Sequence, residues 1–155
     1  MKITGEKGVG NLLKIFLQIC FVFGIVFLGA LPFVLSSMGL HLNAAMFIIY
    51  PNGIVLLIIV YKFIKLFDSL KNNKPFSEKN VKILKATSIV SLIGSLLWLL
   101  DLMYEIFLAK SQMIVSNFAL FFLFVLFLGV SIALYILAEL FKQATEYKEE
   151  NDLTI

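Results

Sequence analysis

The chain has 155 residues, of which 61% are hydrophobic and only 15% are charged, and its formal net charge is +3. Soluble domains of this length are about half apolar and a quarter charged, because they need a polar surface. The composition therefore excludes a soluble globular enzyme, a disordered regulator and a disulfide-stapled secreted module, and it indicates an integral membrane protein. All 13 basic residues are lysines, whereas nucleic-acid readers rely on arginine, so direct nucleic-acid binding is not expected.

The first apolar segment covers about residues 12–35 and carries no charge from Ile15 to Leu35. Roughly 20 apolar residues are enough to span a hydrocarbon core of about 30 Å, so this segment is predicted to be a transmembrane helix. It is too long for the apolar part of a signal peptide, and no A-x-A cleavage pattern follows it. We therefore expect the helix to be retained.

The second apolar segment, about residues 44–68, is interrupted by Pro51, Asn52 and Gly53. Proline is favourable at the first position of a helix, whereas inside a helix it removes a hydrogen bond and causes a kink. One interpretation starts the helix at Pro51 and leaves residues 36–50 as an outer loop. The other interpretation is a longer, kinked helix. In both, Lys62 and Lys65 lie near the inner end and can reach the lipid headgroups.

A polar connector, residues 69–80, is followed by a third apolar segment over about residues 81–109 and a fourth over about 113–141. The connector ends with signals for the start of a helix: Ser77 is a suitable N-cap, Glu78 places a negative charge in the first turn, and Phe76 can pack on Val81. The tail, residues 142–155, is polar, and its continuation of the last helix is left open.

The distribution of lysine predicts the orientation of the helices. Twelve of the 13 lysines lie near the two termini and the central connector, and only Lys110 lies on the opposite side. Lysine-rich segments stay in the cytoplasm. The sequence therefore predicts an all-α fold, a single domain over residues 1–155 that forms a four-transmembrane-helix bundle in the plasma membrane, with both termini in the cytoplasm.

Two acidic residues lie in the outer half of the third segment. Asp101 and Glu105 are four residues apart and share one helix face, and Asp101 lies about 12 Å from the segment end at Ala109 at 1.5 Å per residue. Ionisable residues at this depth usually face the bundle interior or a wet cavity, which indicates a cation or proton site, or a polar contact to a ligand. The alternative is that both acids mark the outer interface beside Lys110.

The same side of this helix carries a stripe of small or polar residues. A stripe of this kind also allows close packing between helices, so it does not by itself indicate a binding site. Its members are Thr87, Ser88, Ser91, Gly94, Ser95 and Trp98.

The connector is a candidate contact loop through Lys71, Lys74, Phe76 and Lys79. It could bind anionic headgroups, at about 1 kcal/mol per lysine near the surface, or dock a cytoplasmic protein. The alternative is a solvated topology signal. No catalytic, cofactor or metal site is predicted, because the chain has one cysteine and one histidine and no hydrolase or phosphate-binding motif.

The connector run Lys74-Pro75-Phe76-Ser77-Glu78-Lys79-Asn80 and the acidic ending before Leu153-Thr154-Ile155 resemble a bacterial four-helix membrane family known as a domain of unknown function. The resemblance covers nearly the whole chain and carries no catalytic residues. Members are often encoded beside a Cro/CI-like helix-turn-helix regulator, which implies a regulatory protein as a partner.

The leading hypothesis is a non-enzymatic membrane protein with a sensing, regulatory or partner-binding role. Its expected partners are the lipid bilayer and a cytoplasmic regulator protein, and a homo-oligomer is left open. The alternative is a small transporter or immunity-type membrane protein with a polar site at Asp101 and Glu105.

Overall fold

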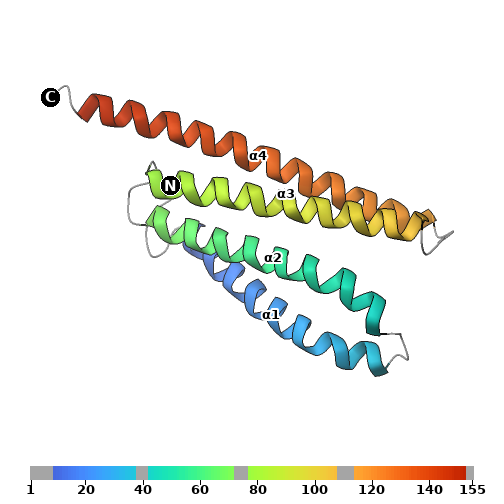
Figure 1. Ribbon diagram of the computed structural model, residues 1–155. Coiled ribbons are helices and arrows are strands. Elements are labelled where there is room, and N and C mark those ends of the chain that lie inside the picture. The colour runs from blue at the N-terminus through green and yellow to red at the C-terminus, as the bar shows by residue number, and fades with distance from the viewer. Residues whose placement is uncertain (1–8, 38–41, 72–76, 108–113, 153–155) are drawn as a thin grey trace.

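The computed structural model describes residues 9–37, 42–71, 77–107 and 114–152, which form four helices. The helices are α1 (Val9–Ser37), α2 (Leu42–Lys71), α3 (Glu78–Phe107) and α4 (Ile114–Asp152). Successive helices run in opposite directions (Figure 1). The predicted all-α class is confirmed. The start of α1 and the end of α4 lie at the end of the bundle where α2 ends and α3 begins, which we name the connector end.

Three helices are long and apolar enough to cross a membrane within the described residues: α1, α3 and α4. Their apolar spans cover Gly10–Val34, Glu78–Phe107 and Ser116–Lys148. The fourth helix, α2, is not among them. Its 30 residues would reach about 45 Å, but Asn52, two lysines and Asp68 interrupt its apolar run.

The helix at Pro51 is continuous, which decides between the two interpretations of the second segment. Pro51 lies inside α2, which begins nine residues earlier at Leu42. Residues on both sides of Pro51 contact α1. The Tyr50 hydroxyl donates a hydrogen bond to the Leu28 carbonyl at 2.9 Å. A Cβ atom on Gly53 would lie 2.6 Å from Leu28 Cδ2. The absence of a side chain at Gly53 therefore lets α1 approach α2 closely.

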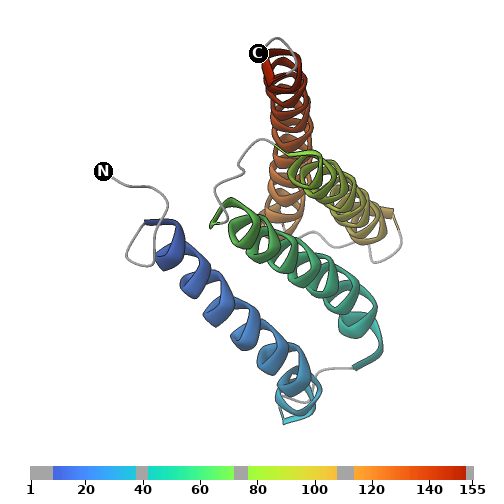
Figure 2. The ribbon, with the colours of Figure 1, turned by 90° about the vertical axis from the view of Figure 1, so that its left-hand side faces the viewer.

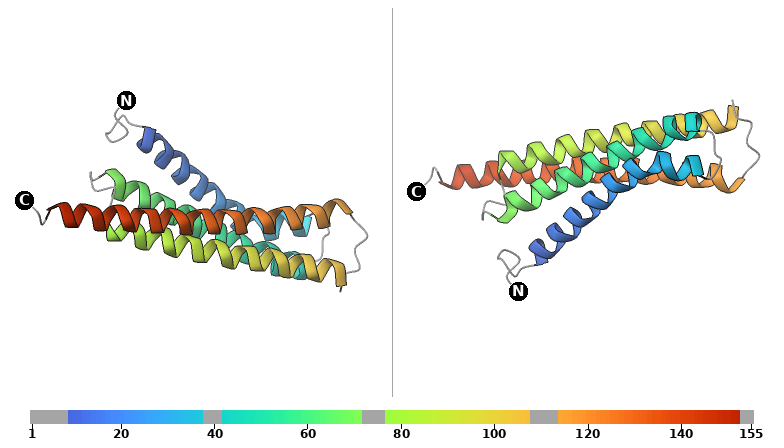
Figure 3. Two further views of the ribbon diagram at one scale, coloured as in Figure 1. Left: turned by 90° about the horizontal axis from the view of Figure 1, so that it is seen from above. Right: turned by 90° about the horizontal axis from the view of Figure 1, so that it is seen from below.

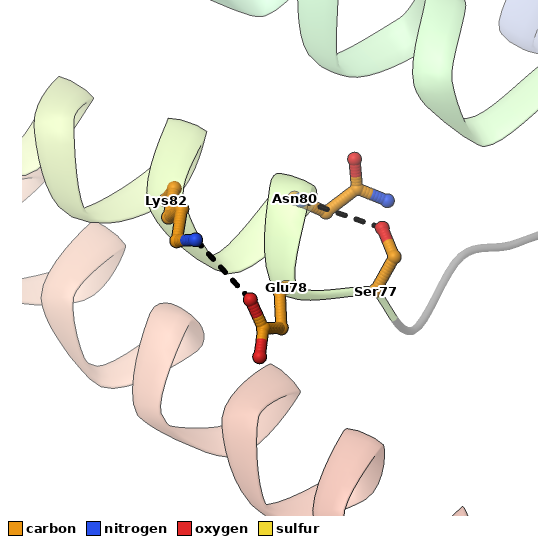
Figure 4. Close-up of polar contacts among 4 residues, drawn as sticks. All are labelled: Ser77, Glu78, Asn80 and Lys82. Carbon is orange, nitrogen blue, oxygen red and sulfur yellow. Dashed lines mark hydrogen bonds and ion pairs between the residues drawn. The ribbon is translucent and has the colours of Figure 1, made fainter.

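The start of α3 has the predicted N-cap. The Asn80 backbone N–H donates to the Ser77 hydroxyl at 3.4 Å (Figure 4). The Ser77 carbonyl accepts from the N–H groups of Asn80 at 3.0 Å and Val81 at 3.2 Å. The cap places the first helical residue at Glu78, so the helix begins three residues before the apolar segment predicted over residues 81–109. At the other end of the chain, α4 continues to Asp152, so most of the polar tail extends the last helix.

The helices differ in how much of their surface they bury. The contact between α3 and α4 is the most extensive, and the backbone of α1 contacts α2 alone among the described residues. A small core joins α2, α3 and α4 at Leu66, Leu84, Leu134 and Ala138. Toward its first residue, α1 diverges from the other helices, as Figures 2 and 3 show. Among the described residues, α2 therefore contacts α1 about as extensively as it contacts α3, and α1 is attached to the bundle through α2 alone.

Candidate functional site

The small polar stripe of α3 is buried against its neighbours. Thr87, Ser88, Ser91, Gly94 and Ser95 are among the buried residues of α3. The Ser91 hydroxyl donates to the Phe127 carbonyl at 3.0 Å, and the Ser131 hydroxyl of α4 donates to the Ser88 carbonyl at 2.8 Å. Small residues at helix contacts let backbones approach closely enough for such bonds. Over this length the stripe therefore holds α3 to α4.

Gly94 lies where three helices meet. A Cβ atom added there would lie 2.8 Å from Phe127 Cδ1 of α4 and 2.9 Å from Val55 Cγ1 of α2. Real Cβ atoms do not approach other atoms this closely, so any larger residue has to displace a ring or a β-branched side chain. Gly94 thus fixes the separation of α2, α3 and α4, two helical turns before Asp101 on α3.

The predicted acid Asp101 is hydrogen bonded to a residue of another helix. The Nδ2 atom of Asn52 donates to Oδ2 of Asp101 at 2.7 Å. Asn52 is only 6% exposed, whereas Asp101 and Glu105 are half-buried. Glu105 lies one turn further along α3, toward its end. Hydrogen bonds between membrane helices contribute to their association, so this bond helps to hold α2 against α3 in this half of the bundle.

A cavity of about 370 Å³ lies beside this hydrogen bond. All four helices contribute to its wall, and nearly all of the lining side chains are apolar. The lining residues are Gly24, Phe27, Leu28, Ile49, Asn52, Gly53, Leu56, Leu57, Trp98, Leu123 and Phe127. Pockets for small molecules usually measure about 300–1,000 Å³ and combine an apolar wall with a few polar groups. In size and chemistry this cavity matches such a pocket.

Trp98 supplies the second polar group of the cavity. Its ring packs against the Phe127 ring, with centroids 6.5 Å apart. Its indole Nε1 is buried and has no hydrogen-bond acceptor in the part of the chain that the structure describes. Buried polar groups without a partner are rare, and an unsatisfied donor costs about 1–3 kcal/mol. Because Nε1 is itself not accessible, an acceptor atom on a bound molecule reaches this N–H only if the Trp98 ring turns.

The sequence identified one side of this site and missed the other. Asp101, Glu105 and Trp98 were singled out on α3, but Asn52 was noted only as part of the interruption at Pro51. An asparagine in an apolar run at membrane depth is itself a signal, because unsatisfied amides are costly there. Across the described ranges, no group of three or more His, Cys, Asp or Glu side chains could hold a metal ion.

The predicted contact loop is described only in part. Lys71 is the last residue of α2, Lys74 and Phe76 lie outside the described residues, and Lys79 is exposed in the first turn of α3. Lys79 lines a crevice of about 640 Å³ between α2 and α3, together with other lysines. Its full lining is Tyr61, Lys62, Lys65, Glu78, Lys79, Lys82, Ile83 and Ala86.

Two ion pairs join helices toward the connector end. The Lys85 ammonium lies 2.6 Å from the Glu139 carboxylate and links α3 to α4. Lys14 pairs with Asp68 and links α1 to α2. The Lys85 ammonium also lies 5.9 Å from the centre of the Tyr135 ring. These partly exposed pairs hold neighbouring helices together where the apolar spans end.

Long apolar helices with a buried polar seam, and lysines gathered at one end, define a helical membrane protein. More specifically, the chain belongs to the family described as Protein of unknown function (DUF2975), whose match covers residues 12–155. No curated protein and no solved structure matches the chain. This match agrees with the resemblance drawn from the sequence. The family description names no reaction, so no activity follows from it.

Proposed function

We propose that all four helices cross the plasma membrane, with both termini in the cytoplasm. The direction of the helices supports a crossing by α2: α1 and α3 run the same way along the bundle, so a chain that crosses in α1 and again in α3 has to return between them. The position of 12 of the 13 lysines supports the cytoplasmic placement of the connector end.

This topology is tested by labelling single cysteines in intact cells with a membrane-impermeant maleimide, in a background where Cys20 is replaced by serine. A cysteine at Ser111, between α3 and α4, should react from outside the cell. Cysteines at Asn73 and Thr154 should react only after the cells are opened. Labelling of Thr154→Cys from outside would contradict the proposed orientation.

We further propose that the protein is a non-enzymatic sensor that binds a small, largely apolar molecule in the cavity between the four helices. The observation that carries this proposal is the buried Nε1 donor of Trp98 in an apolar wall, next to the Asn52–Asp101 hydrogen bond. Such a site suits a ligand with an apolar body and one acceptor oxygen, because the acceptor would pair with the indole N–H.

The position of the cavity indicates how ligand binding would change the structure. A ligand there contacts Phe27 and Leu28 of α1 as well as Phe127 of α4, although the backbones of these two helices do not touch. A ligand shifts an equilibrium only as far as its affinities for the two states differ. Because α1 is held by α2 alone, its position is the arrangement that occupancy of the cavity would change.

Occupancy of the cavity can be measured directly, because Trp98 is the single tryptophan of the chain. Trichloroethanol, a small apolar alcohol that quenches indole fluorescence, should quench the purified protein in nanodiscs with a saturable component. The variant Leu123→Phe fills the cavity wall and should remove that component. Leu126→Phe is the matched control, because residue 126 lies on the same helix outside the lining and is 42% exposed.

Linear quenching in the wild type, or equal loss in both variants, would contradict a binding site at Trp98. Saturable quenching that survives Leu123→Phe would place the alcohol elsewhere.

The output of the sensor would be contact with a cytoplasmic regulator protein through the connector, at Lys71, Lys74, Phe76 and Lys79. The support is the accumulation of positive charge at the connector end, where Lys79 lies beside other lysines. The test is affinity purification from the native host after cross-linking, using the wild type and the variant Lys74→Glu/Lys79→Glu. Equal recovery of the same partner with both proteins would contradict a contact at the connector.

A second candidate function is a small transporter whose coupling site is Asp101 and Glu105. The observation that favours it is the hydrogen bond from Asn52 to Asp101 between two helices, since intramembrane acids often mark proton or ion pathways. In proteoliposomes, Asp101→Asn/Glu105→Gln should abolish pH-driven uptake of a cationic dye. Unchanged flux in the double variant would reject the transporter.

A further inference from the structure

The crevice between α2 and α3 at the connector end brings together charges that are far apart in the chain. Lys62 and Lys65 come from the last third of α2, and Lys79 and Lys82 come from the first turns of α3. Glu78 is the single carboxylate in the lining, so the four lysines leave a clear positive excess around a space of about 640 Å³. An excess of this kind is unfavourable unless anions are near.

The lysines are arranged so that their ammonium groups remain available. The Lys65 ammonium lies 4.7 Å from the centre of the Tyr61 ring, at the edge of the crevice. Lys82 pairs with Glu78 at 3.1 Å, but both side chains are about three-quarters exposed. Figure 4 shows this pair on one side of α3, while the amide of Asn80 points away from it. An exposed pair one turn apart is worth little, so an anion can compete for Lys82.

The start of α3 adds to the positive potential. The helix begins at Glu78, directly at the crevice, and the first turn of a helix carries a partial positive charge of about half an elementary charge. Helix N-termini bind phosphate groups through this charge and their N–H groups. The Glu78 carboxylate offsets part of this charge and Ser77 already accepts the Asn80 N–H, so the four lysines from two helices supply most of the positive potential that suits a phosphate.

The crevice also has apolar lining residues. Tyr61, Ile83 and Ala86 line it together with the lysines. One turn deeper, Ile58 of α2 and Ile89 of α3 lie on the same helix faces as Lys62 and Ala86, and they are 38% and 58% exposed. Charge at the end of a span followed by exposed apolar residues fits an amphiphile with an anionic head and an acyl chain.

We propose that this crevice binds the phosphate headgroup of an anionic phospholipid, with Lys62, Lys65, Lys79 and Lys82 around the phosphate and an acyl chain lying along Ile58 and Ile89. A free phosphate ion shares the headgroup chemistry but would make no use of the apolar stripe. The site is separate from the cavity at Trp98, and it depends on membrane insertion and not on the sensor function.

The test compares lipid binding to the purified full-length protein in detergent by native mass spectrometry. Phosphatidylglycerol should bind at least tenfold more tightly than phosphatidylcholine with the same acyl chains. Lys65→Gln/Lys82→Gln should weaken phosphatidylglycerol on the order of thirtyfold, from about 1 kcal/mol per lysine and 1.4 kcal/mol per tenfold change in affinity. Lys65→Arg/Lys82→Arg should retain binding, because the charge is kept.

The control variant is Lys142→Gln/Lys148→Gln on α4. It removes the same charge and also breaks one exposed pair four residues apart, Lys142–Glu146 at 3.6 Å, as the crevice variant does for Lys82 and Glu78. The control should weaken phosphatidylglycerol less than threefold. Equal losses in the two variants would mean that net charge alone attracts the lipid, and the site would be rejected.

Two further outcomes would also overturn the proposal. Equal binding of phosphatidylglycerol and phosphatidylcholine would mean that the crevice does not select anionic headgroups. Displacement of phosphatidylglycerol by an equal concentration of inorganic phosphate would show an ion site without any contribution from the acyl chain.

Discussion

The two ends of the chain are held to the bundle in different ways. In the most apolar stretch of each span, 33% of the α3 residues are buried, but only 11% of the α4 residues and 6% of the α1 residues. Two interhelical hydrogen bonds of serine side chains and an ion pair join α3 to α4. Among the described residues, a tyrosine hydrogen bond, an ion pair, the Phe21–Tyr61 ring pair and close packing at two glycines join α1 to α2. The contact between α3 and α4 is therefore more extensive than the contact between α1 and α2.

This difference matters because lipid removes the usual driving force for packing. In a bilayer the surrounding acyl chains are as apolar as leucine, so helices associate through close packing and interhelical hydrogen bonds. A helix with few of either is the element that separates at the lowest free-energy cost. We therefore expect α1, which contacts α2 alone among the described residues, to be the mobile part of the bundle, and we name the other three helices the frame.

The largest expected effect is at the centre of the frame. Gly94→Leu places a side chain where a Cβ atom alone would lie 2.8 Å from Phe127 and 2.9 Å from Val55. Overpacking of this kind costs about 2–3 kcal/mol, so the detergent-solubilised variant should unfold at a much lower temperature or fail to fold. Gly129→Leu is the control, because a Cβ atom there has no neighbour within 4 Å. If both variants unfold alike, Gly94 does not hold the three helices together.

The next effect in size is at the contact of α1 with α2. Gly53→Leu meets Leu28 Cδ2 at 2.6 Å, but that atom is the tip of a flexible side chain on a loosely held helix. We expect a loss of about 1–2 kcal/mol in the same unfolding assay, because α1 can move aside. Gly29→Leu, with open space around its Cβ position, should be near neutral. A loss at residue 53 as large as that at residue 94 would mean that α1 belongs to the rigid frame.

The sequence could predict the helices because polar or charged segments separate long apolar runs. The N-cap at Ser77 was also predictable, since a serine before an acidic first turn is a local signal. The end of α4 was left open, because the polar tail has no apolar stripe to indicate a packed helix. In the structure Thr145, well inside that tail, is 8% exposed, so residues of another helix determine its burial.

The candidate site was only half predictable for a similar reason. The spacing of Asp101 and Glu105 places them on one face, but which helix lies opposite depends on the rotation and depth of α2. Asn52 and Asp101 are 49 residues apart in the chain, and no local pattern joins them. The lysine crevice between α2 and α3 was missed likewise, because its lysines come from both sides of the connector.

Removing interhelical hydrogen bonds should have a smaller effect than overpacking. Ser91→Ala/Ser131→Ala deletes the two hydroxyl donors between α3 and α4, and Tyr50→Phe deletes the donor between α2 and α1. Hydrogen bonds between membrane helices are worth about 0.6 kcal/mol each. The serine double variant should therefore lose about 1 kcal/mol, and Tyr50→Phe about half as much, in chemical unfolding with a mild denaturing detergent. An unchanged serine double variant would mean that packing alone holds α3 to α4.

The smallest effect should come from the two ion pairs, and it bears most directly on the mobility of α1. Double-mutant cycles with Lys85→Gln and Glu139→Gln, and with Lys14→Gln and Asp68→Asn, measure the coupling within each pair. Both couplings should be small and should fall with added salt, because the charges are partly exposed. The Lys14–Asp68 coupling should be the weaker, since a pair between helices that separate readily exists for only part of the time. Burial does not separate the two pairs, because Lys14 and Asp68 are 23% and 51% exposed and Lys85 and Glu139 are 38% and 36% exposed. A stronger coupling at Lys14 would therefore show that the connector end of α1 is fixed to α2, and that any motion of α1 occurs at its other end.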